Sequence, residues 1–485
     1  MWPFGKKKKK DIEETPVPKP AEPEYTCLFC RKKFHANQIV FARTLRTPDA
    51  EFRDEIFDEK LSQYQRMNAA TADGRQLGLS TVFRRMMDMN TCEVVAREKN
   101  GLPLAVRGKL KGRQHENMAQ EDNLRFSEFG FSESYGSDVD EEEEVLAQER
   151  LCPYCHFTLP EGFATDRVIQ VGLLGGSRSG KTTYMAVVTE YLKNKMGSLN
   201  TGLELAKVEI LPECQKYQEA LYYRQRETKG ADTTPIVGEI RDQMIMPIII
   251  HLTPLNDQYP PFFLVFQDIP GEYLIPNPQT RDLLTGSNIP RSNALIMLVD
   301  VNHFIYSLQH PRLEPGEREI DSEFGGYCKQ DVNTLFNNLE YLSFVIPKGQ
   351  LNSVQCVLTK LDFWIEEERD RIGDTLFVLP GDDAHRKEID EDRLILVHDQ
   401  IEAMLNGIGG EDQSGLLNAL VKSMHLEDTK VHRSYSAVAS RIVPGHEEQL
   451  RQNGADYQTS LNVLEPLMNI FAWEHVLPVK PSEYN

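Results

Sequence analysis

The chain has 485 residues, of which 40% are hydrophobic and 26% charged, a composition typical of a globular protein with two or three domains. Its formal net charge of -20 argues against nucleic-acid binding through one broad basic face, because phosphate neutralisation dominates such binding. The chain lacks both an apolar run long enough to span a membrane and the apolar segment of a secretory signal, so we expect a cytoplasmic protein.

Residues 1–24 combine a lysine run with several prolines, a composition that cannot bury a core. We therefore predict a disordered basic and proline-rich tail. Together with Trp2 and Phe4, the run Lys6 to Lys10 could contact an anionic membrane surface. The alternative is a solvated tail, since neither an amphipathic helix nor a lipidation signal accompanies the lysines.

Eight cysteines do not suggest a disulfide scaffold in a chain this long, and four of them form two Cys-x-x-Cys pairs: Cys27 with Cys30, and Cys152 with Cys155. Four thiolates are the ligand set of a structural, tetrahedral zinc. Residues 31–151 separate the pairs, whereas about 15 to 20 residues are usual, but the cost of loop closure grows only logarithmically with length. We predict a zinc ribbon over residues 25–160, with two unconnected reduced pairs as the alternative.

The insert between the cysteine pairs, residues 35–150, is mostly polar. Its first part, Phe34 to Phe41, is consistent with a short strand or hairpin that completes the first metal knuckle. The apolar spacing within residues 51–89 favours one or two helices. The acidic run Asp138 to Glu144 predicts a solvated loop. The insert is thus predicted to be partly helical and partly disordered, and no function is assigned to it.

Residues 163–485 alternate apolar runs with helical patterns, which indicates an α/β domain with a mostly parallel sheet. Predicted strands cover residues 168–174, 244–252, 262–266, 294–299, 353–358 and 431–435. The second and third of these favour a hairpin at the sheet edge. Predicted helices cover residues 182–193 and the apolar segment around residues 463–473, which would close the sheet.

A glycine-containing motif follows the first of these strands and opens the first helix. It consists of Gly175, Gly176, Ser177, Arg178, Ser179, Gly180, Lys181, Thr182 and Thr183. In this context backbone N–H groups and the positive end of the helix converge on phosphate oxygens. Lys181 would contact the β and γ phosphates and the Thr182 hydroxyl would ligate Mg²⁺. The alternative is an ordinary glycine turn.

Asp268, at the end of the strand 262–266, begins an Asp-Ile-Pro-Gly motif. Its carboxylate could hold magnesium through a water, and Gly271 could offer a backbone N–H to the γ-phosphate.

Thr359, Lys360, Leu361 and Asp362 follow the strand 353–358, at the sheet edge where α/β ligands bind. Asp362 can accept hydrogen bonds from the ring N1–H and the exocyclic amine of guanine, a donor pair that adenine lacks. The Lys360 stem would pack over the base. A surface lysine and aspartate at a strand end are the alternative.

These motifs, in this order, resemble the Ras-like and translation-factor class of phosphate-loop GTPases. The resemblance implies a three-layer domain that binds GTP or GDP with Mg²⁺, and a backbone contact from Ser436 and Ala437 to the guanine oxygen. It also implies that Thr233 or Thr234 senses the γ-phosphate, although a Thr-Thr-Pro segment is usually only a turn. Within the class, the chain is most similar to a prokaryotic double-GTPase group. That similarity implies a multi-protein system of the conflict or defence type, with a second GTPase or an activating protein as partner.

One departure from the class concerns hydrolysis. Glu272 stands where Ras-like enzymes have a glutamine that orients water. An ionised carboxylate is repelled by the γ-phosphate, but one with a raised pKa could act as a base. Arg178 could supply charge in cis, or could face solvent. We expect slow or partner-stimulated GTP hydrolysis, and the alternative is a nucleotide-responsive scaffold with negligible turnover whose zinc ribbon docks a protein.

Overall fold

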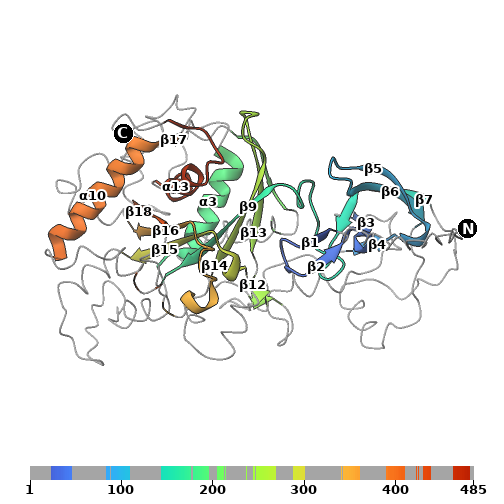
Figure 1. Cartoon of the computed structure of the whole chain (residues 1–485), viewed down its shortest axis with the longest axis horizontal. Helices are drawn as coiled ribbons and strands as arrows, with labels where there is room; N and C mark the ends of the chain where they lie inside the picture. The colour runs from blue at the N-terminus through green and yellow to red at the C-terminus, as the bar shows by residue number, and fades with distance from the viewer. Residues whose placement is uncertain are drawn as a thin grey trace, which may run out of the picture.

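The structure is a computed structural model, and it describes the following residues: 23–45, 83–87, 89–109, 144–175, 179–195, 205–211, 214, 236–237, 244–245, 247–268, 288–300, 340, 342–360, 389–409, 422, 424, 430–438 and 462–480. Two regions lie along the long axis of the molecule (Figure 1). The strands of residues 24–151 form one end, and a seven-stranded sheet with its helices forms the other.

The large sheet is mostly parallel, as the sequence predicts. In spatial order its strands are β10 (Leu205–Ile210), β13 (Ile248–Pro254), β14 (Phe262–Asp268), β9 (Arg167–Leu174), β15 (Ala294–Asp300), β16 (Ser353–Thr359) and β18 (His432–Ala437). All neighbours from β14 to β18 pair in parallel, whereas β13 pairs antiparallel with both β14 and β10. Every residue of β14, β15 and β16 is buried, which explains their continuous apolar character.

The predicted hairpin of β13 and β14 is present, but the prediction differs from the structure in two respects. Strand β10 was not predicted, and it places the hairpin one strand inside the edge. In addition, Met244–Ile245 is a separate strand, β12, which pairs with β11 (Ile236–Val237). Pro247 precedes β13, and because proline has no N–H it cannot extend the ladder toward β12.

Three helices cover the sheet within the described residues: α3 (Lys181–Lys195), α10 (Glu391–Gly409) and α13 (Glu465–Trp473). Helix α3 packs against β10 and β14, whereas α13 packs against β16 and β18, and α10 against β18. Phe471 of α13 meets Phe262 of β14 edge-on, with ring centroids 5.3 Å apart. A short parallel pair, β17 (Ile389–Asp390) with β19 (Val479–Lys480), joins the chain before α10 to the chain after α13. The three-layer arrangement predicted from the sequence stays a prediction.

The N-terminal region is built from short antiparallel strands. Its sheets are β1 (Glu24–Thr26) with β2 (Lys33–His35), then β4 (Phe83–Met86), β3 (Val40–Leu45) and β8 (Glu149–Leu151), and then β5 (Glu93–Arg97), β6 (Pro103–Lys109) and β7 (Glu144–Ala147). Residues 83–86, at the end of the segment 51–89 for which one or two helices are predicted, form a strand, because pairing with β3 holds them extended. Residues 46–82 and 110–143 lie outside the described part of the chain.

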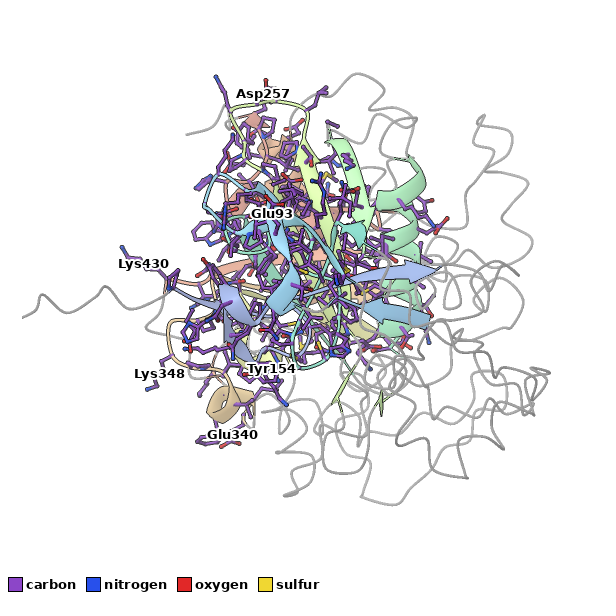
Figure 2. All side chains as sticks on the ribbon, turned by 90° about the vertical axis from the view of Figure 1, so that its right-hand side faces the viewer. Glu93, Tyr154, Asp257, Glu340, Lys348 and Lys430 are labelled. Carbon is purple, nitrogen blue, oxygen red and sulfur yellow. The ribbon has the colours of Figure 1, made fainter. Side chains whose placement is uncertain are left out.

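A buried ion pair joins two separate segments of the N-terminal region. The Arg150 side chain is 2% exposed, and its Nη2 lies 2.6 Å from Glu98 Oε1. The same nitrogen donates a hydrogen bond to the Pro160 carbonyl oxygen, and the guanidinium lies 5.4 Å from the centre of the Phe163 ring. By contrast, Lys348 and Lys430 are exposed at the periphery of the molecule (Figure 2). The described insert is thus a packed part of the N-terminal region.

Candidate nucleotide site and four-cysteine centre

The phosphate-loop motif runs from Gly175, directly after β9, into the first turn of α3. A side chain at Gly175 would place Cβ 2.5 Å from the Leu298 carbonyl oxygen and 2.4 Å from Ser179 Oγ, so the position admits only glycine. Gly180 has a φ of 87°, a conformation that glycine adopts without strain. The backbone therefore requires both glycines that the sequence analysis singled out.

Lys181 lies over this loop. It is only 7% exposed, and its Nζ donates a hydrogen bond to the Gly175 carbonyl oxygen at 2.9 Å. The side chain therefore returns to the start of the loop instead of pointing into solvent. A buried ammonium group is costly without compensating charge, and a phosphate in the loop would supply that charge. Thr183 follows in the first turn of α3 and is partly buried.

Thr182 and Asp268 meet across the carboxyl edge of the sheet. Thr182 lies in the first turn of α3, and Asp268 ends β14, 86 positions later in the chain. The Thr182 hydroxyl donates a hydrogen bond to Asp268 Oδ2 at 2.7 Å, and Asp268 is fully buried. Parallel pairing of β14 with β9 causes this approach, because it sets Asp268 opposite Leu173. A hydroxyl and a carboxylate oxygen fit a hard cation such as Mg²⁺.

Thr359 connects the third motif to the phosphate loop. Its hydroxyl lies 3.0 Å from the carbonyl oxygen of Ser179 and 3.3 Å from that of Val299, and it can donate to either. Lys360 has a φ of 62°, and its Nζ forms an ion pair with Asp300 Oδ2 at the end of β15. The base loop, defined as Thr359 to Asp362, therefore starts from Thr359, whose hydroxyl contacts two neighbouring segments.

Ser436 and Ala437 are the last two residues of β18, whereas the sequence analysis placed them after the strand. The strand is longer because Ala437 pairs with Leu358 of β16. Ser436 Oγ accepts a hydrogen bond from the buried Asn469 Nδ2 at 3.3 Å. The Ser436 hydroxyl is therefore bonded within the protein, and a contact to the base would come from the backbone.

Several predicted site residues lie outside the described part of the chain: Ser177, Arg178, Thr233, Thr234, Gly271, Glu272 and Asp362. Of the phosphate-loop and magnesium residues, the structure brings together Gly175, Ser179, Lys181, Thr182 and Asp268. Because this group comes from the loop after β9, from helix α3 and from strand β14, it forms through the sheet topology and not through one local turn.

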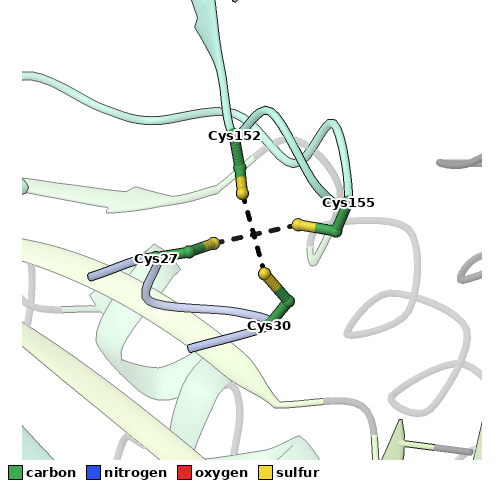
Figure 3. Close-up of side chains that lie close together, drawn as sticks. All are labelled: Cys27, Cys30, Cys152 and Cys155. Atoms are coloured by element: carbon green, nitrogen blue, oxygen red, sulfur yellow. Dashed lines mark hydrogen bonds between the residues drawn. The ribbon is translucent and has the colours of Figure 1, made fainter. Parts of the chain in front are cut away.

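The four cysteines of the two pairs converge in one buried cluster (Figure 3). The Sγ atoms of Cys27 and Cys155 are 3.8 Å apart, those of Cys30 and Cys152 are 3.6 Å apart, and all four lie within 4.8 Å of one another. Tetrahedral zinc with bonds of about 2.3 Å sets sulfur atoms about 3.8 Å apart. The donor set and its spacing therefore fit one zinc ion with four protein ligands.

The thiols differ in acidity because they interact with one another. Hydrogen bonds from neighbouring thiols, chiefly Cys152, lower the pKa of Cys30, and those from Cys155 lower the pKa of Cys152. Burial raises the pKa of Cys27 and Cys155 well above the ordinary value. Since thiolates are the form that binds metal, a dication in this cluster would displace the thiol protons that persist.

The two knuckles share one backbone conformation. In each, the residue before the second cysteine, Phe29 or Tyr154, donates its N–H to the first cysteine's Sγ at 3.4 Å. In each, the residue after the second cysteine is left-handed: Arg31 has a φ of 59° and His156 a φ of 56°. The matching knuckles direct the sulfur atoms of both pairs toward one point, as expected for a shared metal.

Sequence reasoning assigned no role to Asp300, which the structure brings to Lys360. The only sequence signal was an aspartate at the end of a predicted strand, and such residues are common. It also gave no sign of the contact between Glu98 and Arg150. The first pair depends on the register of β15 and β16, whereas Glu98 follows β5 and Arg150 lies in β8, a strand of another sheet.

The strand order, the loop after β9 and the contact between Thr182 and Asp268 define an α/β fold of the phosphate-loop class. No protein-family model matches the chain. A segment of 43 residues is 44% identical to part of a putative ESX-1 scaffolding and assembly protein, SaeC, of Mycolicibacterium smegmatis. That match covers 9% of this chain and 11% of the relative.

Solved structures similar to the chain are GTPases of several kinds. The signal recognition particle receptor SRb-GTP/SRX complex from Chaetomium thermophilum is 16% identical with a TM-score of 0.25, and the match covers 59% of this chain and 97% of that one. LeoA, a bacterial dynamin GTPase from ETEC, is 14% identical with a TM-score of 0.26, and the match covers 65% and 38%. Separately, none of the helices in the described ranges has the length and apolar character needed to cross a membrane.

Proposed function

We propose that the protein binds GTP and GDP with Mg²⁺ and hydrolyses GTP as a molecular switch. The observation that carries this proposal is the convergence of Lys181, Thr182 and Asp268 at the carboxyl edge of the sheet. Lys181 would contact the β and γ phosphates, and Thr182 and Asp268 would hold the cation. Magnesium bound there would neutralise charge on the phosphate oxygens.

The proposed base preference for guanine depends on Asp362, two residues after Lys360. Thr359 supports this assignment because it fixes the start of the base loop to the phosphate loop. Phosphate and base recognition would then share one framework. The carboxylate of Asp362 would accept two hydrogen bonds from guanine, and adenine would leave that carboxylate without these donors. The main-chain segment of Ser436 and Ala437 would contact the guanine oxygen.

Hydrolysis is proposed to be slow or stimulated by a partner, because Glu272 replaces the glutamine that orients water in Ras-like enzymes. Arg178 is the proposed source of positive charge in cis. Gly271 would donate its N–H to the γ-phosphate, and Thr233 or Thr234 would sense that phosphate.

We further propose that Cys27, Cys30, Cys152 and Cys155 bind a structural zinc, because the four thiols are buried and spaced for tetrahedral coordination. Four protein ligands leave no open position for substrate, so this metal would stabilise the ribbon. The ribbon would dock a protein partner, either a second GTPase or an activating protein, within a cytoplasmic multi-protein system of the prokaryotic conflict or defence type.

The nucleotide preference of the purified protein tests this proposal. GTP and ATP are titrated separately into the wild-type protein and Asp362→Ala, with Mg²⁺ present. We expect the wild type to prefer GTP and the variant to lose that preference by roughly 100-fold, since a buried hydrogen-bonding site rejects a mismatched base strongly. Equal affinity for both nucleotides in the wild type would contradict the guanine assignment.

Single-turnover hydrolysis of bound GTP, with and without cell extract, decides between a switch and a scaffold. Cleavage that is slow alone and faster with extract supports the switch. The absence of cleavage under both conditions supports the nucleotide-responsive scaffold.

A further inference from the structure

Asp300 ends β15 and is almost completely buried, with 2% of its side chain exposed. Strand β15 lies between β9, which leads into the phosphate loop, and β16, which leads into the base loop. Asp300 pairs in register with Thr359, the last residue of β16. A carboxylate is therefore placed at the carboxyl edge of the sheet, beside the start of the base loop.

The Asp300 carboxylate forms an ion pair with the Lys360 ammonium. Lys360 belongs to the loop after β16, so this ion pair joins the end of β16 to the end of β15. The backbone of Lys360 is left-handed, with a φ of 62°. A residue with a side chain adopts this conformation at an energetic cost, so contacts are needed to hold it.

Asp300 and Thr359 hold the beginning of the base loop from two directions. Thr359 fixes the main chain to the phosphate loop through Ser179, and Asp300 fixes the Lys360 side chain to β15. Asp362 follows two residues later. The orientation of the Lys360 side chain is thus coupled to Asp300.

We propose that Asp300 is a positioning residue for guanine recognition. It fixes the side chain of Lys360, two residues before Asp362, which the proposed function assigns to the guanine edge. This inference rests on the proposed function. It adds a residue in a different strand, which makes no contact with the nucleotide itself, to the determinants of guanine preference.

Asp300→Asn tests the inference because it preserves the size of the side chain and an oxygen that can accept from Lys360, while it removes the charge. Charge-assisted hydrogen bonds are roughly twice as strong as neutral ones. Affinities for GDP and ADP are measured by calorimetry with Mg²⁺. We expect the ratio of ADP to GDP dissociation constants to fall about tenfold, through weaker GDP binding, with ADP binding unchanged.

Glu24→Gln is the matched control. It makes the same carboxylate-to-amide change in an exposed ion pair, with Lys33 at 2.6 Å, in the N-terminal region. This variant is expected to keep the wild-type ratio. If Asp300→Asn does not fold, Lys360→Gln tests the same ion pair. Lys360 is the more exposed partner, with 28% of its side chain accessible.

The outcomes separate the two proposals. A wild-type protein without guanine preference overturns the proposed function and this inference with it. A wild type that prefers GDP, with Asp300→Asn at the same ratio, overturns the inference alone. An equal loss of affinity for both nucleotides also overturns it, because a merely structural ion pair would act on the whole pocket.

Discussion

The nucleotide site and the four-cysteine centre both join distant parts of the chain, but they do so by different means. Thr182 and Asp268 are 86 positions apart and meet because parallel strands end at one edge, where a direct hydrogen bond joins them. Cys30 and Cys152 are 122 positions apart, and their sulfur atoms approach to 3.6 Å. Thiols are weak hydrogen-bonding groups, so the proposed zinc would hold the second site together far more than a bound cation would hold the first.

Loss of the proposed zinc should therefore have the largest effect on stability, and that effect should be confined to the N-terminal region. Cys152→Ser should lose zinc and unfold the ribbon, because structural zinc contributes on the order of 10 kcal/mol to the folding of small domains. Zinc content by mass spectrometry and limited proteolysis measure the change. The nucleotide affinity of the sheet should persist. A variant with full zinc content and a protected ribbon would refute the shared site.

The second prediction concerns the buried ion pair of Arg150 and Glu98 within the N-terminal region. Arg150→Met should destabilise the N-terminal region by about 3 to 5 kcal/mol, because it leaves a buried Glu98 carboxylate without its cation. Lys33→Met is the control, since it breaks an exposed pair of the same length and should cost about 0 to 1 kcal/mol. Urea unfolding measures both. Equal effects would show that burial does not distinguish the two pairs.

The third prediction concerns His432 in the large sheet, where the expected effect on stability is smaller. Burial, with a contribution from nearby His398, lowers the pKa of His432 to about 4, and its ring stacks on Trp473 at 4.6 Å. Between pH 6.5 and pH 4 the unfolded chain binds a proton that the folded chain does not, so stability should fall as the pH falls through this window.

His432→Phe keeps an aromatic ring against Trp473 but cannot be protonated. Its melting temperature should therefore fall less steeply with decreasing pH than that of the wild type. The cysteines contribute equally to both proteins, so the difference between the two curves isolates His432. Parallel curves would contradict the assignment.

Some strands of the fold could be predicted from the sequence, and others could not. Strands β14, β15 and β16 were predicted because burial on both faces gives continuous apolar runs. Strand β10 was missed because it lies at the sheet edge and carries the exposed Lys207 and Glu209. Strand β4 was missed because its paired partner β3, and not a local pattern, makes it extended.

The candidate sites likewise contain motifs that the sequence predicts and contacts that it does not. The phosphate loop and the cysteine pairs were predicted because each depends on residues at short, fixed spacings. The contacts of Asp300 with Lys360, and of Thr359 with Ser179, could not be predicted. They arise from the alignment of strand ends, which no spacing within one motif encodes.

The central claim is that Thr182 and Asp268 form the cation side of a nucleotide pocket. The most direct measurement is GTP affinity by calorimetry, with Mg²⁺ and with EDTA, for the wild type and Asp268→Asn. We predict that chelation weakens wild-type binding at least about tenfold and that the variant binds weakly under both conditions, because one carboxylate ligand is lost. Affinity that depends on neither magnesium nor Asp268 would contradict the claim.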